Sequence, residues 1–306
     1  MTQGPTPAIL LAVLGAVLFS AKAILVKLCY QYGADAETVL ALRMVFSLPF
    51  FWGAVWWYTA ARNPAPVQRK DLLTMLALGF IGYYLSSYLD FLGLQYITVG
   101  LERIILYLNP TLVLVISAVA LGKRIDARQW VAMAIAYAGV ALVFLHDVRI
   151  DGQRTFLGGS LVFMCAVTYA IYLIFAGEIV KRVGSIRVVA YASASSTFFC
   201  VVQALIVNPQ GLVTQGLEVY ALSLLNASLC TFAPMLLIMA AVNRIGPALT
   251  AQAGVVGPVA TVFLGWYYLG ERISVLQVVG VIVVLVSMGV LLTVARTSPP
   301  PVQVAE

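Results

Sequence analysis

The chain has 306 residues, of which 62% are hydrophobic and only 10% are charged, and its mean hydropathy is +0.99. These values exclude an ordinary soluble domain. A net charge of +6 would suggest a nucleic-acid partner in a soluble protein, but here the basic residues gather in the loops between apolar segments. We therefore expect a protein that lies in the lipid bilayer and binds no nucleic acid.

The apolar segments are long enough to cross the bilayer, which takes about 20 residues of helix. They are continuous rather than alternating, which indicates helices and not a barrel. The first segment lacks the basic start and the cleavage site of a signal peptide. We expect ten transmembrane helices, in chain order at about residues 8–29, 37–59, 71–93, 98–121, 127–146, 156–181, 186–208, 217–241, 246–269 and 273–295.

Lysine and arginine are concentrated in alternate loops. If the N-terminus is cytoplasmic, the inner loops hold Arg62, Arg69, Lys70, Lys123, Arg124, Arg128, Lys181, Arg182, Arg187, Arg244 and Arg296. The outer loops and their flanks then hold only Lys27, Arg149, Arg154 and Arg272. Cytoplasmic loops carry such an excess of basic residues, so both termini are predicted to be cytoplasmic.

An internal repeat defines the organisation of the chain. Residues 94–143 reappear without a gap 148 residues later, so that Leu121–Ile125 falls on Leu269–Ile273 and Pro110 on Pro258. The fourth and fifth helices thus match the ninth and tenth. We predict a first repeat over 1–148, a second over 149–296 and a disordered proline-rich tail over 297–306.

The number of helices in each repeat decides its orientation. Five is odd, so the second repeat must enter the membrane upside down relative to the first. The expected fold class is an all-α membrane protein with ten transmembrane helices in two inverted five-helix repeats. In such proteins the substrate binds where the two halves meet.

Pro110 and Pro258 fall well inside the two repeated helices. Proline removes one helix hydrogen bond and bends the helix. Each bend is interpreted either as a static kink that aids packing or as a gate on the permeation path. Gly254 and Gly257, just before the second proline, also allow close helix approach.

At this point the chain resembles a known family. Ten helices in a five-plus-five repeat, the turn Gly93-Leu94-Gln95-Tyr96, a mid-helix proline and a Leu-Gly-Glu-Arg ending at 269–272 are similar to the drug/metabolite transporter superfamily, in particular to EamA-type exporters. The first copy departs from the family pattern, with Gly122-Lys123 in place of Gly-Glu. We interpret the retained Glu271, at a helix end, as a structural marker rather than a binding group.

The resemblance has implications for the site and the activity. It implies a cavity lined mainly by helices 1, 3, 4, 6, 8 and 9. It also implies a transporter of the bacterial inner membrane that exports amino acids or related metabolites.

Ionisable residues at membrane depth are functional candidates by default, because lipid penalises their charge. Lys22, Arg43, Asp90, Glu102 and Arg103 stand out, all in the first half. Lys22 would hold a carboxylate or phosphate or exchange a proton. Otherwise it forms a structural ion pair with Asp90 or Glu102, or snorkels to the interface. Arg43 is expected to pair with Asp90 or Glu102 as a structural link, whereas Glu102 and Arg103 are placed near the interface.

Neutral polar residues complete the candidate site. Tyr83, Ser87 and Asp90 have the spacing i, i+4, i+7 and are expected to share one face of the third helix. Tyr107 and Asn109 come just before the first proline, close to a freed carbonyl. The predicted substrate-binding residues are Lys22, Tyr83, Ser87, Asp90, Tyr107, Asn109, Tyr169, Asn226 and Gln252, with Arg43, Glu102, Pro110 and Pro258 in structural or gating roles.

These features predict a secondary transporter that moves a small organic solute by alternating access. No Gly-x-x-x-x-Gly-Lys-Ser/Thr motif for ATP is present, and the scattered cysteines and single histidine predict no metal and no cofactor. An alternative is proton-coupled efflux of cationic drugs, although Lys22 lies where small multidrug relatives have a glutamate. A membrane-embedded enzyme and a receptor or scaffold are the remaining classes. Protons or a counter-substrate as coupling partners, and monomer or homodimer as assembly, stay open.

Overall fold

The computed structural model describes residues 5–62, 66–122, 125–254 and 256–297. Over these ranges the chain forms helices and no strands. Two short segments, η1 and η2, are π-helical. The elements are α1 (Pro5–Gln31), α2 (Ala36–Arg62), α3 (Arg69–Gly79), η1 (Phe80–Leu85), α4 (Ser86–Leu94), α5 (Val99–Leu106), α6 (Asn109–Leu121), α7 (Ala127–Asp151), α8 (Gln153–Val183), α9 (Ser185–Val207), α10 (Leu217–Ala227), η2 (Ser228–Phe232), α11 (Ala233–Ala253), α12 (Val256–Leu269) and α13 (Val275–Thr297).

The helices form a multi-pass membrane bundle. Within the described ranges, eight helical segments are long and apolar enough to cross a bilayer, and two shorter apolar helices follow at Val256–Leu269 and Val275–Gly289. Large apolar side chains such as Trp56, Val119 and Val275 are exposed on the outer surface of the bundle, as expected for a surface that meets lipid. The prediction of an all-α membrane protein is confirmed, and the number of ten crossings stays a prediction.

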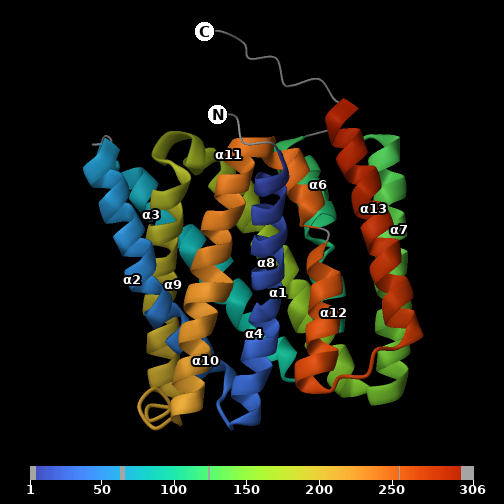
Figure 1. The fold of residues 1–306 in the computed structure, drawn as a ribbon, viewed down its shortest axis with the longest axis horizontal. Helices are drawn as coiled ribbons and strands as arrows, with labels where there is room; N and C mark the ends of the chain where they lie inside the picture. The colour runs from blue at the N-terminus through green and yellow to red at the C-terminus, as the bar shows by residue number, and fades with distance from the viewer. Residues whose placement is uncertain (1–4, 63–65, 123–124, 255, 298–306) are drawn as a thin grey trace.

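Each half of the chain packs against corresponding helices of the other half. The first helix, α1, lies against α11 and α12, and α8, the first helix of the second half, lies against α4 and α6. Likewise α2 pairs with α9, and α7 with α13 (Figure 1). The beginning of α1 and the end of α13 lie at the same edge of the bundle (Figure 1). The packing therefore follows the repeat that the sequence shows.

The two π-helical segments lie at equivalent positions of the repeat. η1 begins at Phe80 and η2 at Ser228, which is the offset of 148 residues found in the sequence. In each, a backbone N–H bonds the carbonyl five residues earlier, from Ser86 to Ile81 and from Ala233 to Ser228. Such π-bulges occur frequently at functional sites. The two halves therefore correspond in structure also at the third and eighth predicted helices, which lie outside the sequence repeat of residues 94–143.

Each repeated proline lies at a helix break rather than at a bend. The helix predicted over 98–121 is divided into α5 and α6, and Pro110 occupies the first turn of α6. Pro258 likewise lies in the first turn of α12. Proline is tolerated in a first turn because its missing N–H would have no helix partner there. The breaks free backbone groups inside the bundle.

The chain reverses direction at the predicted boundary between the eighth and ninth helices, although the helical structure is not interrupted there. Asn226 bonds Lys22 and Ile238 lies beside Gly15, whereas Gly257 bonds Ser20 further along α1. The sequence places this boundary near residues 242–245, whereas helical structure continues from Leu217 through η2 to Ala253, and α12 starts at Val256.

Arg244 is exposed, so its charge does not oblige the helix to stop. The helix is interrupted at Gly254, whose carbonyl accepts a 2.9 Å hydrogen bond from the N–H of Gly257, and α12 then continues along α1 from Ser20 to Lys27. Glycine followed by proline interrupts a helix more strongly than an exposed charged residue does.

The turn before α2 is fixed by Asp35. Its carboxylate accepts 2.7 Å hydrogen bonds from the backbone N–H of Thr38 and from Nδ2 of Asn208. Partial burial opposes ionisation, but these hydrogen bonds lower the pKa of Asp35 below its usual value. This turn caps the start of α2 and joins it to the end of α9.

Candidate functional site

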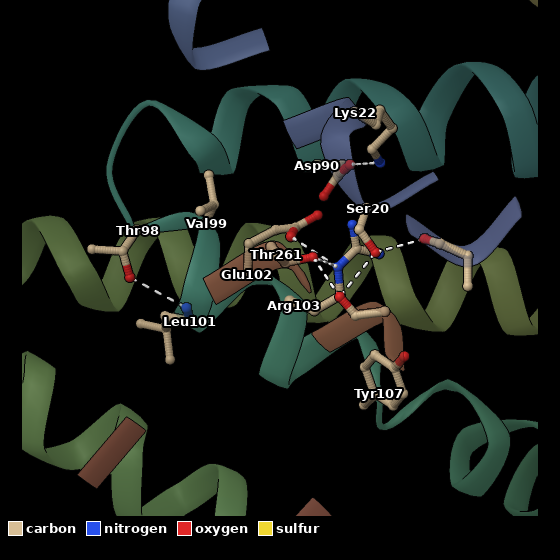
Figure 2. A network of polar contacts seen from close by, with 12 residues as sticks. Ser20, Lys22, Asp90, Thr98, Val99, Leu101, Glu102, Arg103, Tyr107 and Thr261 are labelled. Carbon is tan, nitrogen blue, oxygen red and sulfur yellow. Dashed lines mark hydrogen bonds and ion pairs between the residues drawn. The ribbon is translucent and has the colours of Figure 1, made fainter. Parts of the chain in front are cut away.

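A buried ion pair joins the first helix to the fourth. Lys22 on α1 places its Nζ 2.6 Å from Oδ2 of Asp90 on α4 (Figure 2). The two side chains are 9% and 2% exposed. The other oxygen of Asp90, Oδ1, has no hydrogen-bond partner in the described part of the chain. The ion pair predicted between Lys22 and Asp90 is present, and the buried position of Lys22 excludes snorkelling in this structure, whereas binding of a solute by Lys22 stays a prediction.

Glu102 lies deep in the protein, beside this pair. Its side chain is fully buried, and neither carboxyl oxygen has a hydrogen-bond partner among the described residues. Its closest cation is Arg103, whose Nε lies 3.9 Å from Oε2. Arg103 is also buried; its Nε donates to Oγ1 of Thr261 at 3.1 Å, while its Nη2 has no partner in the described ranges. Both side chains are buried inside the protein, because α5 is buried on nearly all sides, and their position near the membrane interface stays a prediction.

Arg43 makes a different contact from the one expected. Its Nε donates to Oγ1 of Thr231 at 3.0 Å, which links α2 to η2. The ion pairs found among the described residues do not include one between Arg43 and Asp90 or Glu102, and Nη1 of Arg43 has no partner there. The structural link predicted for Arg43 therefore exists, but to the second half of the chain. We refer to Lys22, Arg43, Asp90, Glu102 and Arg103 as the charge cluster.

Two phenylalanine rings separate the cations of the charge cluster. Lys22 Nζ lies 5.9 Å from the ring centres of both Phe19 and Phe91. The guanidinium of Arg43 lies 5.4 Å from the Phe91 ring, and that of Arg103 lies 5.8 Å from the Phe19 ring. Cation–π contacts of this kind stabilise buried positive charge. Sequence reasoning missed both rings, although Phe91 directly follows the candidate aspartate.

The helix breaks of the two halves meet beside the charge cluster. The hydroxyl of Tyr107, at the first break, donates to the carbonyl of Gly254, at the second, over 3.4 Å. Pro258 cannot supply the N–H that this carbonyl would receive in a regular helix. Ser20 on α1 donates to the carbonyl of Gly257 at 2.9 Å. Broken helices that meet in this way form the substrate sites of many secondary transporters.

Of the remaining predicted residues, Asn226 contacts the charge cluster, whereas two tyrosines form a separate group that is described below. Asn226 donates through Nδ2 to the backbone carbonyl of Lys22 at 3.2 Å, and Oδ1 of both Asn226 and Asn109 has no partner among the described residues. Ser87 is half-buried on α4. The side chain of Gln252 lies outside the described part of the structure. Asn226 therefore belongs with Lys22.

Tyr83 and Tyr169 form a separate aromatic group around Tyr172. Their ring centres lie 5.3 Å and 5.7 Å from that of Tyr172. Tyr83 lies inside η1, whose wider turn changes the side-chain register between Tyr83 and Asp90. The expected shared face of Tyr83, Ser87 and Asp90 assumed a regular α-helix, so the π-helical turn removes the basis for that spacing.

Glu271 connects three elements at the far end of the bundle. Its Oε1 lies 2.8 Å from Nζ of Lys27, at the end of α1, and its two oxygens accept the N–H of Val99 at 3.2 Å and 3.0 Å. Val99 begins α5, where backbone N–H groups attract negative charge. These contacts agree with the interpretation of Glu271 as a structural residue.

Replacing Glu271 with glutamine is expected to destabilise the protein by about 1–2 kcal/mol, because the change removes the negative charge that α5 and Lys27 share. Thermal unfolding in detergent measures the effect. Glu218→Gln, an exposed position in the first turn of α10, is the control and is expected to leave the midpoint nearly unchanged. Equal midpoints for the two variants would show that the contacts of Glu271 contribute no stability.

Comparison with known proteins places the chain in a family. The model of the EamA-like transporter family matches residues 6–145 and again residues 156–293. A protein of Bacillus subtilis (strain 168), named "Uncharacterized transporter YcbK", is 30% identical over 273 residues, which cover 87% of this chain and 86% of the relative. A transporter of Archaeoglobus fulgidus is 23% identical over 264 residues, covering 86% and 89% of the two chains.

A solved crystal structure shares the fold, with a TM-score of 0.64 and 17% identity, over 95% of this chain and 98% of the other. The chain belongs to the EamA-like transporter family and contains two copies of the family's repeat. It is therefore a multi-pass membrane transporter. The family and the names of its relatives indicate a transporter rather than an enzyme.

Proposed function

We propose that this transporter is a secondary carrier that moves a small organic solute, an amino acid or a related metabolite, across the bacterial inner membrane by alternating access. Export is the proposed direction. The observation that carries the proposal is the charge cluster, where buried polar atoms without partners among the described residues lie beside two helix breaks. Such groups are costly in a purely structural role.

The chemistry of these atoms suits a zwitterion. Nη2 of Arg103 and Nη1 of Arg43 are donors that a solute carboxylate would accept. Oδ1 of Asp90 is an acceptor for a solute ammonium group. With three basic and two acidic side chains, the charge cluster favours the carboxylate end of the solute. The Tyr83, Tyr169 and Tyr172 group would meet the apolar part of the solute.

The proposed movement rests on the packing of the two repeats. We propose ten crossings, an inverted second repeat and both termini in the cytoplasm. The reciprocal packing of α1 and α8 against the third and fourth helices of the opposite half supports this arrangement. Inverted repeats supply alternating access, because one movement opens a side in one half and closes it in the other.

A transport assay in proteoliposomes tests the proposal. Labelled leucine, labelled glutamate and the lipophilic cation tetraphenylphosphonium serve as probes, with empty liposomes as background. We expect saturable amino-acid flux in the wild type that falls by roughly tenfold or more in Lys22→Ala, because a charge-assisted contact contributes about 1.5–3 kcal/mol. Lys70→Ala, an exposed position at the start of α3, is the matched control and should transport normally.

Two outcomes would contradict the proposal. Flux of the cation alone, unaffected by Lys22→Ala, would favour the efflux of cationic drugs instead. Equal amino-acid flux in Lys22→Ala and Lys70→Ala would remove the charge cluster from the solute site.

A further inference from the structure

We infer that Glu102 is a proton-binding site and that its proton moves together with the solute. The inference rests on the proposed function for the solute, but the protonation of Glu102 is argued from the geometry alone. It makes the carrier a proton–solute symporter. A cytoplasmic solute that has accumulated would then leave the cell with a proton.

The surroundings of Glu102 are unsuitable for an ionised carboxylate. The side chain is fully buried, and none of the described residues donates a hydrogen bond to either oxygen. An ionised carboxylate without donors in such a place is strongly disfavoured, and protonation removes that penalty. The 3.9 Å contact with Arg103 offsets little of it, because the same Nε is directed to Thr261.

A proton on Glu102 would also supply a hydrogen bond to Oδ1 of Asp90, which has no partner among the described residues. The carboxyl groups of Glu102 and Asp90 point toward each other (Figure 2) and interact directly. Two carboxylates are both acceptors, so neither can bond the other unless one carries a proton. The other oxygen of Asp90, Oδ2, lies 2.6 Å from Nζ of Lys22, which donates to it. A protonated Glu102 can then donate to Oδ1 of Asp90.

The charged and titratable groups around Glu102 come from several elements. Lys22 of α1, Asp90 of α4 and Arg103 of α5 itself interact with it, as do Cys165 of α8 and Tyr107 after α5. The further elements packed against α5 present the neutral side chains of Thr261 on α12 and Gln277 on α13. Asp147, at the end of α7, bonds Gln277 at 3.4 Å and His146 at 3.1 Å.

The same cations link the proton to the solute. While Glu102 is neutral, Nη2 of Arg103 has no partner among the described residues and is available to a solute carboxylate. When Glu102 loses its proton, its own charge competes for Arg103 and Lys22. Solute and proton therefore bind together and leave together, which is a positive coupling between two sites.

Infrared spectroscopy detects the proton without any solute. We expect the wild type in lipid nanodiscs at neutral pH to show the carbonyl band of a protonated carboxylic acid, and Glu102→Gln to lack that band. Glutamine is an isosteric mimic of the neutral acid, so this variant should fold. Glu218→Gln, which changes an exposed carboxyl group, should keep the band. A spectrum in which Glu102→Gln removes no such band would overturn the inference.

A second assay follows the coupling itself. Proteoliposomes that contain a pH-sensitive dye receive a gradient of leucine or glutamate. We expect the lumen of wild-type vesicles to acidify as solute enters, Glu218→Gln to behave likewise, and Glu102→Gln to lose the pH change. Glu102→Asp, which retains an acid, should recover part of it. A pH change that persists in Glu102→Gln would overturn the coupling. Absence of amino-acid flux in the wild type would count against the proposed function, while the infrared band would still decide whether Glu102 holds a proton.

Discussion

Asp90→Ala is expected to lower the free energy of unfolding by about 3–5 kcal/mol, because it leaves the buried Lys22 ammonium without the carboxylate that now lies 2.6 Å away. Unfolding followed by heat or denaturant in detergent measures the loss. Lys181→Ala removes an ion pair of similar length, 2.9 Å, whose side chains are 71% and 69% exposed. That control should change stability by less than about 1 kcal/mol, since water already solvates both groups.

A double variant that replaces both Lys22 and Asp90 distinguishes the contribution of the pair to stability from its contribution to transport. The double variant Lys22→Met with Asp90→Leu fills the site with apolar side chains that need no partner, and such replacements are often neutral or stabilising. We expect it to recover most of the stability lost in Asp90→Ala. A double variant that is as unstable as Asp90→Ala would show that the cost does not come from an unpaired buried charge.

Gly82→Ala is expected to destabilise the protein by about 1–3 kcal/mol or more. Gly82 lies in η1, and a Cβ placed there would overlap the Cβ and Cγ of Tyr172 on α8. Cβ and Cγ are the side-chain atoms of Tyr172 closest to its backbone, so a rotamer change cannot relieve the overlap. The displacement would also disturb the contact between Tyr172 and Tyr83. Thermal unfolding in detergent measures the change.

Gly177→Ala is the matched control for Gly82→Ala. Gly177 lies on α8 as well, is exposed, and has no neighbouring atom within 4 Å of the position that a methyl group would occupy. Alanine in a helix is favoured over glycine by about 1 kcal/mol, so this variant should be unchanged or slightly more stable. Loss of stability of the same size in both variants would contradict the packing role of Gly82.

The sequence allowed much of the architecture to be predicted. Composition and continuous apolar segments indicate a helical membrane protein, and the repeat of residues 94–143 indicates two related halves. The pairing of Lys22 with Asp90 was one of the alternatives weighed for Lys22, because isolated charges at membrane depth require partners. Glu271 was interpreted as structural from its place at a helix end, and its contacts with Lys27 and Val99 agree with this interpretation.

Other features could not be predicted from residue patterns. The segments that form η1 and η2 have different residues, and π-helical turns carry no periodic signal in a uniformly apolar stretch. A regular α-helix assumed in place of η1 gives the wrong angle around the helix axis between Tyr83 and Asp90. The burial of Glu102 depends on α5 being surrounded by α8, α12 and α13, which is a property of the tertiary structure. For the same reason the partner of Arg43, Thr231, lies 188 residues away and follows no local rule.

The most direct test of the solute site is transport by the double variant Lys22→Met with Asp90→Leu. Wild type and variant are reconstituted at equal amounts of folded protein, and saturable flux of leucine and glutamate is measured in both. If the buried pair belongs to the solute site, the wild type transports and the stably folded variant does not. Saturable flux at the wild-type rate in the variant would show that the pair is a structural element and that the solute binds elsewhere.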